Sequence, residues 1–401
     1  MRLLRVEGPP VVAVRIWLRG GQRHEETPGQ ALVAGRLLAE GTRRRDRQTI
    51  AEEAEARGMD LASFGGREVS GVAIDALADD WRTALEWALE LVFEAAFPAD
   101  RLDWLRRQTA SELASLGDHP EVRTGWEFLR QLYDPHPWSR PLQGDSAGLL
   151  KLRRRDCVAF HRRSCAAGMA VTVAGDIDVD RVRPVVEELF GVEAVQAPTA
   201  PLREPSPPRG LAESRREIVT GASDQAHVFL GHLTVGRDHA ARPALDLVGV
   251  VLGAVAGLAG RLPQRIREQE GWAYAVEVET AAGAGLDPGR LEIYAAVSPE
   301  NVGRLERAVR EELERLLEGG IAERELDQAK AYLLGREPFS RETARQWSEI
   351  LAEAGLYRRP VDDPEWVRRR WVEVSPRAAT AAARRFIHPG ELRVTVGWPG
   401  G

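Results

Sequence analysis

A proline-rich stretch at residues 192–210 does most to limit how this chain can fold. It contains five prolines between residues 198 and 208. Proline fixes φ and lacks a backbone N–H, so such a stretch keeps neither a helix nor a central strand. We therefore predict a linker of polyproline character. It divides the 401 residues into an N-terminal half, residues 1–191, and a C-terminal half, residues 211–401, each of ordinary domain size.

The two halves present strands and helices in a similar order, which indicates an internal duplication. The first half closes with a strand containing Val171-Thr172-Val173, and the second closes in the same way with Val394-Thr395-Val396. We predict an α+β fold of two homologous two-layer halves. Each half is expected to hold a mostly antiparallel sheet with helices on one face.

Individual elements follow from apolar periodicity and from turn residues. A hairpin is predicted over Leu61–Leu77 with its turn at Gly65–Gly66, and Thr49 with Glu52 is expected to cap a helix. The other predicted strands are Val11–Leu18, Met169–Ala174, Ala226–Leu233, Tyr274–Thr280 and Leu291–Val297, and the other predicted helices are Trp81–Phe97, Asp100–Gly117, Leu149–Arg163, Ala244–Ala259 and Glu323–Gly335.

Composition argues against several classes of protein. The formal net charge is −6 and no basic block dominates, so nucleic acid is not an expected partner. No run of 18 or more apolar residues occurs, and we predict a cytoplasmic protein with no membrane partner. The two cysteines, Cys157 and Cys165, are too few for a disulfide framework.

Thr27–Thr42, with the sequence TPGQALVAGRLLAEGT, predicts a short helix with marked ends. Thr27 and Gln30 have the spacing of a capping box, Pro28 occupies the expected first helical position, and Gly41 follows the expected end. The residues between are mainly Ala, Leu and Val. We therefore expect this helix to lie against a sheet.

This helix resembles the metal helix of the pitrilysin-like (inverzincin) zinc peptidases, the family of the two-chain mitochondrial processing peptidase. Those proteins read G-x-A-H-x-x-E-H-M-x-x-x-G-T, and the residues kept here are Gly29, Ala31, Gly41 and Thr42. The resemblance implies that Leu32 and Arg36 stand at the two zinc-binding histidines and Gly35 at the general base. It also implies that Glu112, 76 residues beyond Arg36, stands at the third ligand.

Zinc hydrolysis needs two imidazoles one turn apart and a carboxylate that takes a proton from metal-bound water. Leucine and glycine supply neither group, and a guanidinium repels a divalent cation. We predict that this chain binds no cofactor and is no peptidase by itself. One hypothesis is that Arg36 points at Glu112 and replaces the charge of the metal; the alternative is that both are ordinary solvated or paired surface residues.

A second segment, Arg261–Tyr274, resembles the family's R-L-x-x-x-x-R-E-x-x-G-x-A-Y. The matching residues are Leu262, Arg267, Glu268, Gly271, Ala273 and Tyr274. The resemblance implies that Arg267 and Tyr274 hydrogen-bond the substrate peptide near its scissile carbonyl. A fixed cation and a phenolic hydroxyl suit a developing oxyanion. The alternative is structural, with the arginine capping and the tyrosine packing.

These features predict a non-catalytic subunit of a heterodimeric zinc metallopeptidase. A homologous subunit would bring zinc and the general base, and this chain would help to hold a peptide or unfolded polypeptide. The alternative is a structural scaffold or peptide-binding protein of the same fold with no role in proteolysis. A homodimeric peptidase with a relocated metal site is disfavoured, because His227 and His232 have odd spacing on a predicted strand and face opposite sides.

Overall fold

The computed structural model describes residues 1–193, 200–210, 214–221, 223–253, 260–357 and 364–400. The chain forms two compact units. The first comprises Met1–Leu113, Pro141–Pro205 and Glu337–Asp362, and the second comprises Ala114–Arg140, Ser206–Arg336 and Asp363–Gly401. Two segments thus belong to the unit built mainly from the other half of the sequence, an exchange that the predicted boundaries at residues 191 and 211 do not include. Of the predicted linker, 194–199 lie outside the described residues, and 200–210 form no helix or strand.

A five-stranded sheet in the order β1-β5-β2-β4-β3 forms the centre of the first unit. β1 pairs with β5 in parallel, and the other pairs are antiparallel. The predicted hairpin is confirmed, and the Gly66 N–H donates to the Val69 carbonyl at 2.7 Å in its turn. The strands are β1 Arg2–Arg5, β2 Val11–Arg19, β3 Asp60–Gly65, β4 Val69–Leu77 and β5 Met169–Gly175.

The sheet of the second unit repeats this topology strand for strand, in the order β6-β10-β7-β9-β8. β6 is parallel to β10, and the remaining pairs are antiparallel. The predicted fold class and its two homologous halves are therefore confirmed. The strands are β6 Arg215–Gly221, β7 Ala226–Leu233, β8 Ala273–Ala282, β9 Arg290–Val297 and β10 Arg393–Pro399.

Helices surround both sheets. Those of the first unit are α1 Gln30–Arg36, α2 Arg47–Ala56, α3 Trp81–Phe93, α4 Ala99–Gly117 (whose last turn enters the second unit), α6 Ser146–Lys151, α7 Arg154–Ala167, α8 Val179–Glu193 and α13 Ala344–Leu356. Those of the second are α5 Pro120–Tyr133, α9 Arg242–Leu252, α10 Arg261–Pro263, a π-helical turn Gln264–Gln269, α11 Val302–Gly319, α12 Glu323–Arg336, α14 Pro364–Val372 and α15 Pro376–Phe386. Short 3₁₀ turns occur at Gln22–His24, Leu37–Ala39, Ala78–Asp80, Pro137–Ser139, Pro299–Asn301, Glu337–Arg341 and Pro389–Glu391.

Two helix predictions need correction, and a third falls partly outside the described residues. The helix predicted over Leu149–Arg163 is two helices, α6 and α7. The residue that caps α2 is Asp46, whose side chain accepts from the Thr49 N–H, and not Thr49 itself. Asp46 was missed because Thr49 and Glu52 have the same capping-box spacing one turn later. Of the helix predicted over Ala244–Ala259, residues 254–259 lie outside the described residues.

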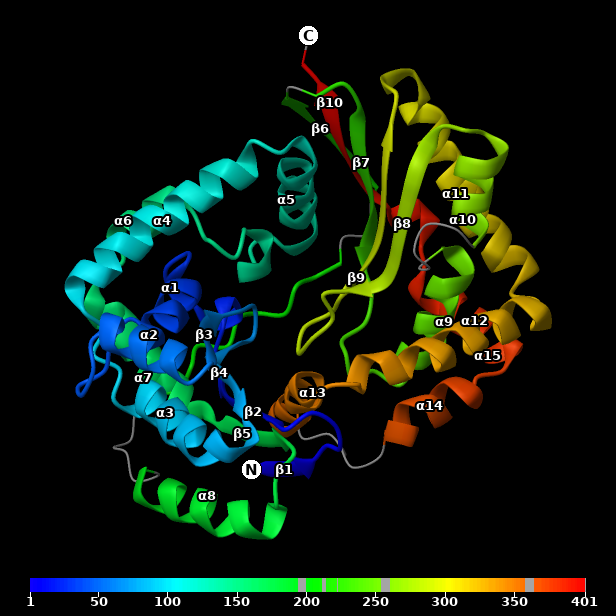
Figure 1. The fold of residues 1–401 in the computed structure, drawn as a ribbon. Helices are drawn as coiled ribbons and strands as arrows, with labels where there is room; N and C mark the ends of the chain where they lie inside the picture. Colours follow the sequence, from blue (N-terminus) through cyan, green and yellow to red (C-terminus); the bar gives the residue numbers. More distant parts are fainter. Residues whose placement is uncertain (194–199, 211–213, 222, 254–259, 358–363, 401) are drawn as a thin grey trace. The chain divides into compact units, whose positions relative to one another are not determined.

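The exchanged segments place one further helix on the second face of each sheet. In the first unit, α13 packs on β5 and β2, where Leu351 and Ala354 cover Ala174. In the second unit, α5 packs on β7 and β10, and Phe128 stacks on Phe229 with 5.6 Å between ring centroids (Figure 1). Each sheet therefore carries helices on both faces, and not on one face as predicted. Tyr274, Glu277 and Glu279 of β8 nevertheless stay exposed.

Two buried histidines in the first unit predict a loss of stability in weak acid. Burial lowers the pKa of His161 to about 4, and burial together with Arg23 lowers the pKa of His24 to about 4. Unfolded histidine titrates near pH 6.5, so between pH 6.5 and 4 the unfolded chain takes up protons that the folded chain refuses. The free energy of unfolding therefore falls as the pH falls through this window, by about 1 kcal/mol per histidine between roughly pH 7 and 5.5.

Denaturant unfolding at a series of pH values tests this prediction. His161→Gln keeps a donor for the Val92 carbonyl, which the ring nitrogen of His161 approaches at 2.7 Å, but it does not titrate. Its stability should fall less steeply between pH 7 and 5.5 than that of the native chain. Equal slopes in the two proteins would contradict the assignment.

Candidate functional site

Helix α1 begins at a different residue from the predicted one. Gly29 adopts the left-handed conformation at φ 82°, and the helix begins at Gln30 with no side-chain cap from Thr27. Instead, Glu25 accepts from the Gly29 N–H at 3.1 Å and from the Ala31 N–H at 3.5 Å. The glycine turn moves the helix start past Thr27, so the predicted Thr27 cap is wrong. Only the Gln30 half of the box is present: the Gln30 side-chain oxygen accepts from the Thr27 N–H at 3.4 Å and, more closely, from the Glu26 N–H at 2.9 Å.

In the next turn of α1, the helix backbone packs directly against the backbone of strand β3. A Cβ placed on Gly35 would lie 2.2 Å from the Phe64 carbonyl oxygen, and one on Gly65 would lie 2.0 Å from the Ala31 carbonyl oxygen. Real Cβ atoms do not approach so closely, so both positions require glycine unless the helix shifts. The Ser63 hydroxyl also donates to the Arg36 carbonyl at 2.9 Å. Gly65, predicted as part of a turn, is therefore also a helix-packing residue.

The remaining positions of the expected metal turn are apolar or cationic. Leu32 is buried, with 5% of its surface exposed. The Arg36 Nη1 donates to both carboxylate oxygens of Glu112 on α4, at 2.9 and 3.1 Å, and lies 3.4 Å from the Thr109 hydroxyl. The predicted contact between Arg36 and Glu112 is therefore present in the structure. The positive charge beside this carboxylate thus comes from the chain itself.

We expect Arg36→Ala to lower the free energy of unfolding by about 1 kcal/mol, because the half-buried Glu112 would lose its cation. Arg82→Ala on α3 is the matched control, since Arg82 pairs with Glu86 on an exposed helix face. That control should change stability by only a few tenths of a kcal/mol. Denaturant unfolding measures both. Equal losses would show that the Arg36 pair is an ordinary surface contact.

In the second unit, Arg267 and Tyr274 lie together. Arg267 belongs to the π-helical turn, Gly271 at φ 65° ends that turn, and β8 begins two residues later. The Arg267 guanidinium carbon lies 5.1 Å from the centre of the Tyr274 ring, and Tyr274 is 85% exposed. A cation held against an exposed phenol is an arrangement able to bind a peptide carbonyl. The role of the pair toward a substrate stays a prediction.

In the part of the chain that the structure describes, the histidines and cysteines are packing residues. Within the described ranges, no group of three or more His, Cys, Asp or Glu side chains could hold a metal ion. His227 hydrogen-bonds the Tyr294 hydroxyl at 3.0 Å, and His232 accepts from the His388 N–H at 3.0 Å, as packing histidines do. Burial raises the pKa of both Cys157 and Cys165 to about 12, so neither thiol is a nucleophile at neutral pH.

Two family models match this chain. "Insulinase (Peptidase family M16)" matches residues 4–145, and "Peptidase M16 inactive domain" matches residues 160–333. The chain belongs to the M16 peptidase family. M16 membership agrees with the resemblance inferred from the degenerate metal helix and from the Arg267–Tyr274 segment.

The relatives of this M16 chain include curated proteins and solved structures. An uncharacterized zinc protease of Mycobacterium leprae is 31% identical over 352 residues, which cover 86% of this chain and 77% of the relative. A crystal structure of a peptidase M16 inactive domain from Pseudomonas fluorescens has a TM-score of 0.89 at 22% identity and covers 100% of this chain and 95% of that one. A protease from Helicobacter pylori also has a TM-score of 0.89, at 16% identity, covering 99% of this chain and 96% of that one.

The residues of this M16 chain do not fit the zinc ion implied by the names of its relatives. Zinc takes imidazole, thiolate or carboxylate ligands, usually four in a tetrahedron. Here a buried leucine and a guanidinium stand at two of the positions, the only carboxylate is engaged by that guanidinium, and Gly35 has no room for a side chain. These residues therefore cannot carry a metal-dependent step.

Proposed function

We propose that this chain is the non-catalytic subunit of a two-chain M16 zinc peptidase. The observation that carries the proposal is the Arg36–Glu112 ion pair, with contacts of 2.9 and 3.1 Å at the position of the family's metal. Because an internal cation engages this carboxylate, the chain binds no cofactor of its own. A homologous partner subunit supplies both the zinc and the general base.

In this proposal, the second unit of the chain positions the substrate. Support comes from the exposed Tyr274 ring with the Arg267 guanidinium 5.1 Å from its centre. The phenol can donate to a carbonyl oxygen, and the guanidinium supplies charge beside it. The substrate is a peptide or an unfolded polypeptide, because an exposed phenol beside a guanidinium can reach the backbone carbonyls of an extended chain.

We also propose that the pair of subunits works in the cytoplasm. Support comes from Cys157 and Cys165, which are both free thiols. Among the described helices, none combines the length and apolarity needed to cross a bilayer.

The test combines this chain with an M16 chain that has an intact H-x-x-E-H helix, preferably one encoded by a neighbouring reading frame. Each chain is purified alone, and the two are then mixed and assayed for zinc content and peptide hydrolysis. We expect hydrolysis only in the mixture, with zinc in the partner alone. Stoichiometric zinc in this chain, or hydrolysis by it in isolation, would refute the proposal.

A structural scaffold is the second candidate function. The observation that favours it is that Arg267 is already engaged inside the chain, since its Nε lies 3.4 Å from Glu268 Oε1 while its guanidinium contacts Tyr274. A chain of Complex III2 from Candida albicans shares the fold, with a TM-score of 0.78 at 12% identity. Substitution of Arg267 and Tyr274 separates the two functions, because only the positioning role predicts a loss of turnover.

A further inference from the structure

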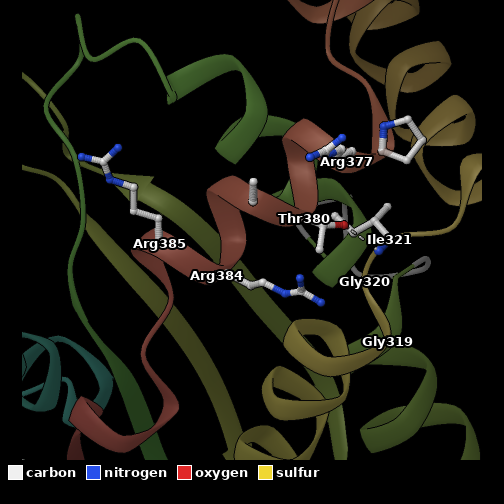
Figure 2. A pocket seen from close by; sticks show the side chains of 9 residues that line it. Gly319, Gly320, Ile321, Arg377, Thr380, Arg384 and Arg385 are labelled. Atoms are coloured by element: carbon white, nitrogen blue, oxygen red, sulfur yellow. Dashed lines mark hydrogen bonds between the residues drawn. The ribbon is translucent and has the colours of Figure 1, made fainter.

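A basic recess opens in the second unit between the end of α11 and helix α15. Its volume is about 600 Å³, and it is lined by the Gly319–Ile321 turn on one side and by Arg377, Thr380 and Arg384 on the other. The Thr380 hydroxyl accepts from the Ile321 N–H at 3.1 Å, which fixes the turn against the helix (Figure 2). Glycine and alanine form much of its floor, so the arginine side chains dominate its chemistry.

Helical spacing arranges these arginines along the recess. Arg377 and Arg384 are seven residues apart, so they lie on one face of α15 about 10 Å apart along its axis. In Figure 2 they lie on either side of Thr380, whereas Arg385 extends away from them. Arg384 is held in place, because its Nε donates to the Leu317 carbonyl at 2.7 Å and its Nη2 to the Glu318 carbonyl at 3.2 Å.

The positive charge of the recess is not neutralised by the part of the chain that the structure describes. No described carboxylate lies within 4 Å of the guanidinium of Arg377, Arg384 or Arg385. Other arginines of the same unit are paired, among them Arg261 with Glu325 and Arg265 with Glu311. On a chain with a formal net charge of −6, this recess is a local positive field, to which the N-terminus of α15 adds its dipole.

A second recess of about 560 Å³ lies along the same helix and shares Ala381 and Arg385 with the first. Its walls are mostly apolar and include Ala382, Phe386 and Val374. Helix α15 therefore forms a low ridge between a basic groove and an apolar groove. Neither groove resembles an enclosed small-molecule pocket, because the arginines that border them are exposed.

We propose that α15 is a docking surface for an acidic amphipathic helix of a partner protein. Its apolar side chains would enter the groove at Phe386, and its carboxylates would meet Arg377, Arg384 and Arg385. Charge complementarity decides the occupant, since uncompensated guanidinium groups attract carboxylates and repel basic segments. This surface is independent of the proposed peptidase function and does not use Arg267 or Tyr274.

The test uses the full chain and an N-acetylated, fluorescein-labelled helical peptide with leucines on one face and glutamates along its border. Fluorescence anisotropy should show binding that weakens as salt is added. The Arg377→Gln/Arg385→Gln variant should weaken binding by about tenfold or more. It leaves Arg384 in place, because Arg384 also hydrogen-bonds the last carbonyls of α11. Arg304→Gln/Arg307→Gln, on the exposed face of α11, is the matched control and should bind as the native chain does.

Four results would overturn the proposal. The first is absence of peptide binding to the native chain. The second is equal binding of a peptide in which lysine replaces every glutamate, which would exclude charge recognition. The third is an equal loss of binding in the control variant, which would show that the peptide responds to the net charge of the chain and not to this surface. Tripolyphosphate is a further arm: if it displaces the peptide and binds the recess as tightly, the site takes small anions and not a partner helix.

Discussion

Replacing Leu32, Gly35 and Arg36 together by histidine, glutamate and histidine will not give this chain a zinc site. We expect the variant to bind no stoichiometric zinc and to unfold more easily by about 5 kcal/mol. Burial of Leu32 would be lost, a glutamate Cβ at position 35 would collide with the Phe64 carbonyl oxygen, and Glu112 would lose its cation. Metal analysis and thermal unfolding measure the two effects.

Single substitutions isolate the steric part of this prediction. Gly35→Ala adds only a Cβ and should cost about 1–3 kcal/mol, because backbone atoms of β3 cannot move aside cheaply. Gly303→Ala on α11 is the matched control, since a Cβ there meets nothing within 4 Å and should stabilise the helix by up to about 1 kcal/mol. A triple variant that folds with unchanged stability and holds one zinc ion would show that helix α1 can readily move away from β3.

The second large effect is expected in the reconstituted two-chain enzyme. Tyr274→Phe in this chain should lower kcat by about 10²-fold, as loss of one oxyanion donor does elsewhere, and Arg267→Ala should do the same. Tyr274→Phe should not alter the melting temperature much, because Tyr274 is 85% exposed. The zinc content of the partner should also stay constant. Steady-state kinetics on the mixture gives kcat and KM separately.

A second arginine–tyrosine pair in the same unit provides the control. On α12, the exposed Arg336 donates to the hydroxyl of the partly buried Tyr332 at 3.1 Å. Tyr332→Phe and Arg336→Ala should leave turnover unchanged. If the Arg267 and Tyr274 variants also leave it unchanged, the chain is a scaffold and the proposed positioning role is wrong.

Much of the fold follows from sequence patterns that act locally. The hairpin at β3–β4 and the paired closing strands β5 and β10 were predicted because alternation and turn glycines are short-range signals. The exchange of α5 and α13 between the units could not be predicted. The sequence of an amphipathic helix reveals its apolar face but not the sheet against which that face packs. Strands β1 and β6 were missed too. β6 is an edge strand with charged residues at Arg215–Glu217 and lacks a clear apolar alternation.

The candidate site was predictable in its residues but not in its packing. Family spacing led to Arg36 and Glu112, and the expected contact between them is present. The backbone contact between Gly35 and β3 could not be predicted, because a glycine pair such as Gly65–Gly66 reads equally well as a turn. The role of Glu25 could not be predicted either. Its carboxylate reaches the start of α1 only because Gly29 adopts a left-handed conformation, which the local sequence does not specify.

The exchanged helix α13 sets an order of events during translation. The last strand of the first sheet ends at Gly175, but α13, which covers one face of that sheet, begins at Ala344. At a ribosomal rate of about 5–20 residues per second, that apolar face stays exposed to solvent for roughly 10–30 s. Nascent chains halted before Ala344 should therefore bind hydrophobic dyes or chaperones, and release of that binding should coincide with the emergence of α13. The first sheet is thus covered on that face only after more than 340 of the 401 residues have been made.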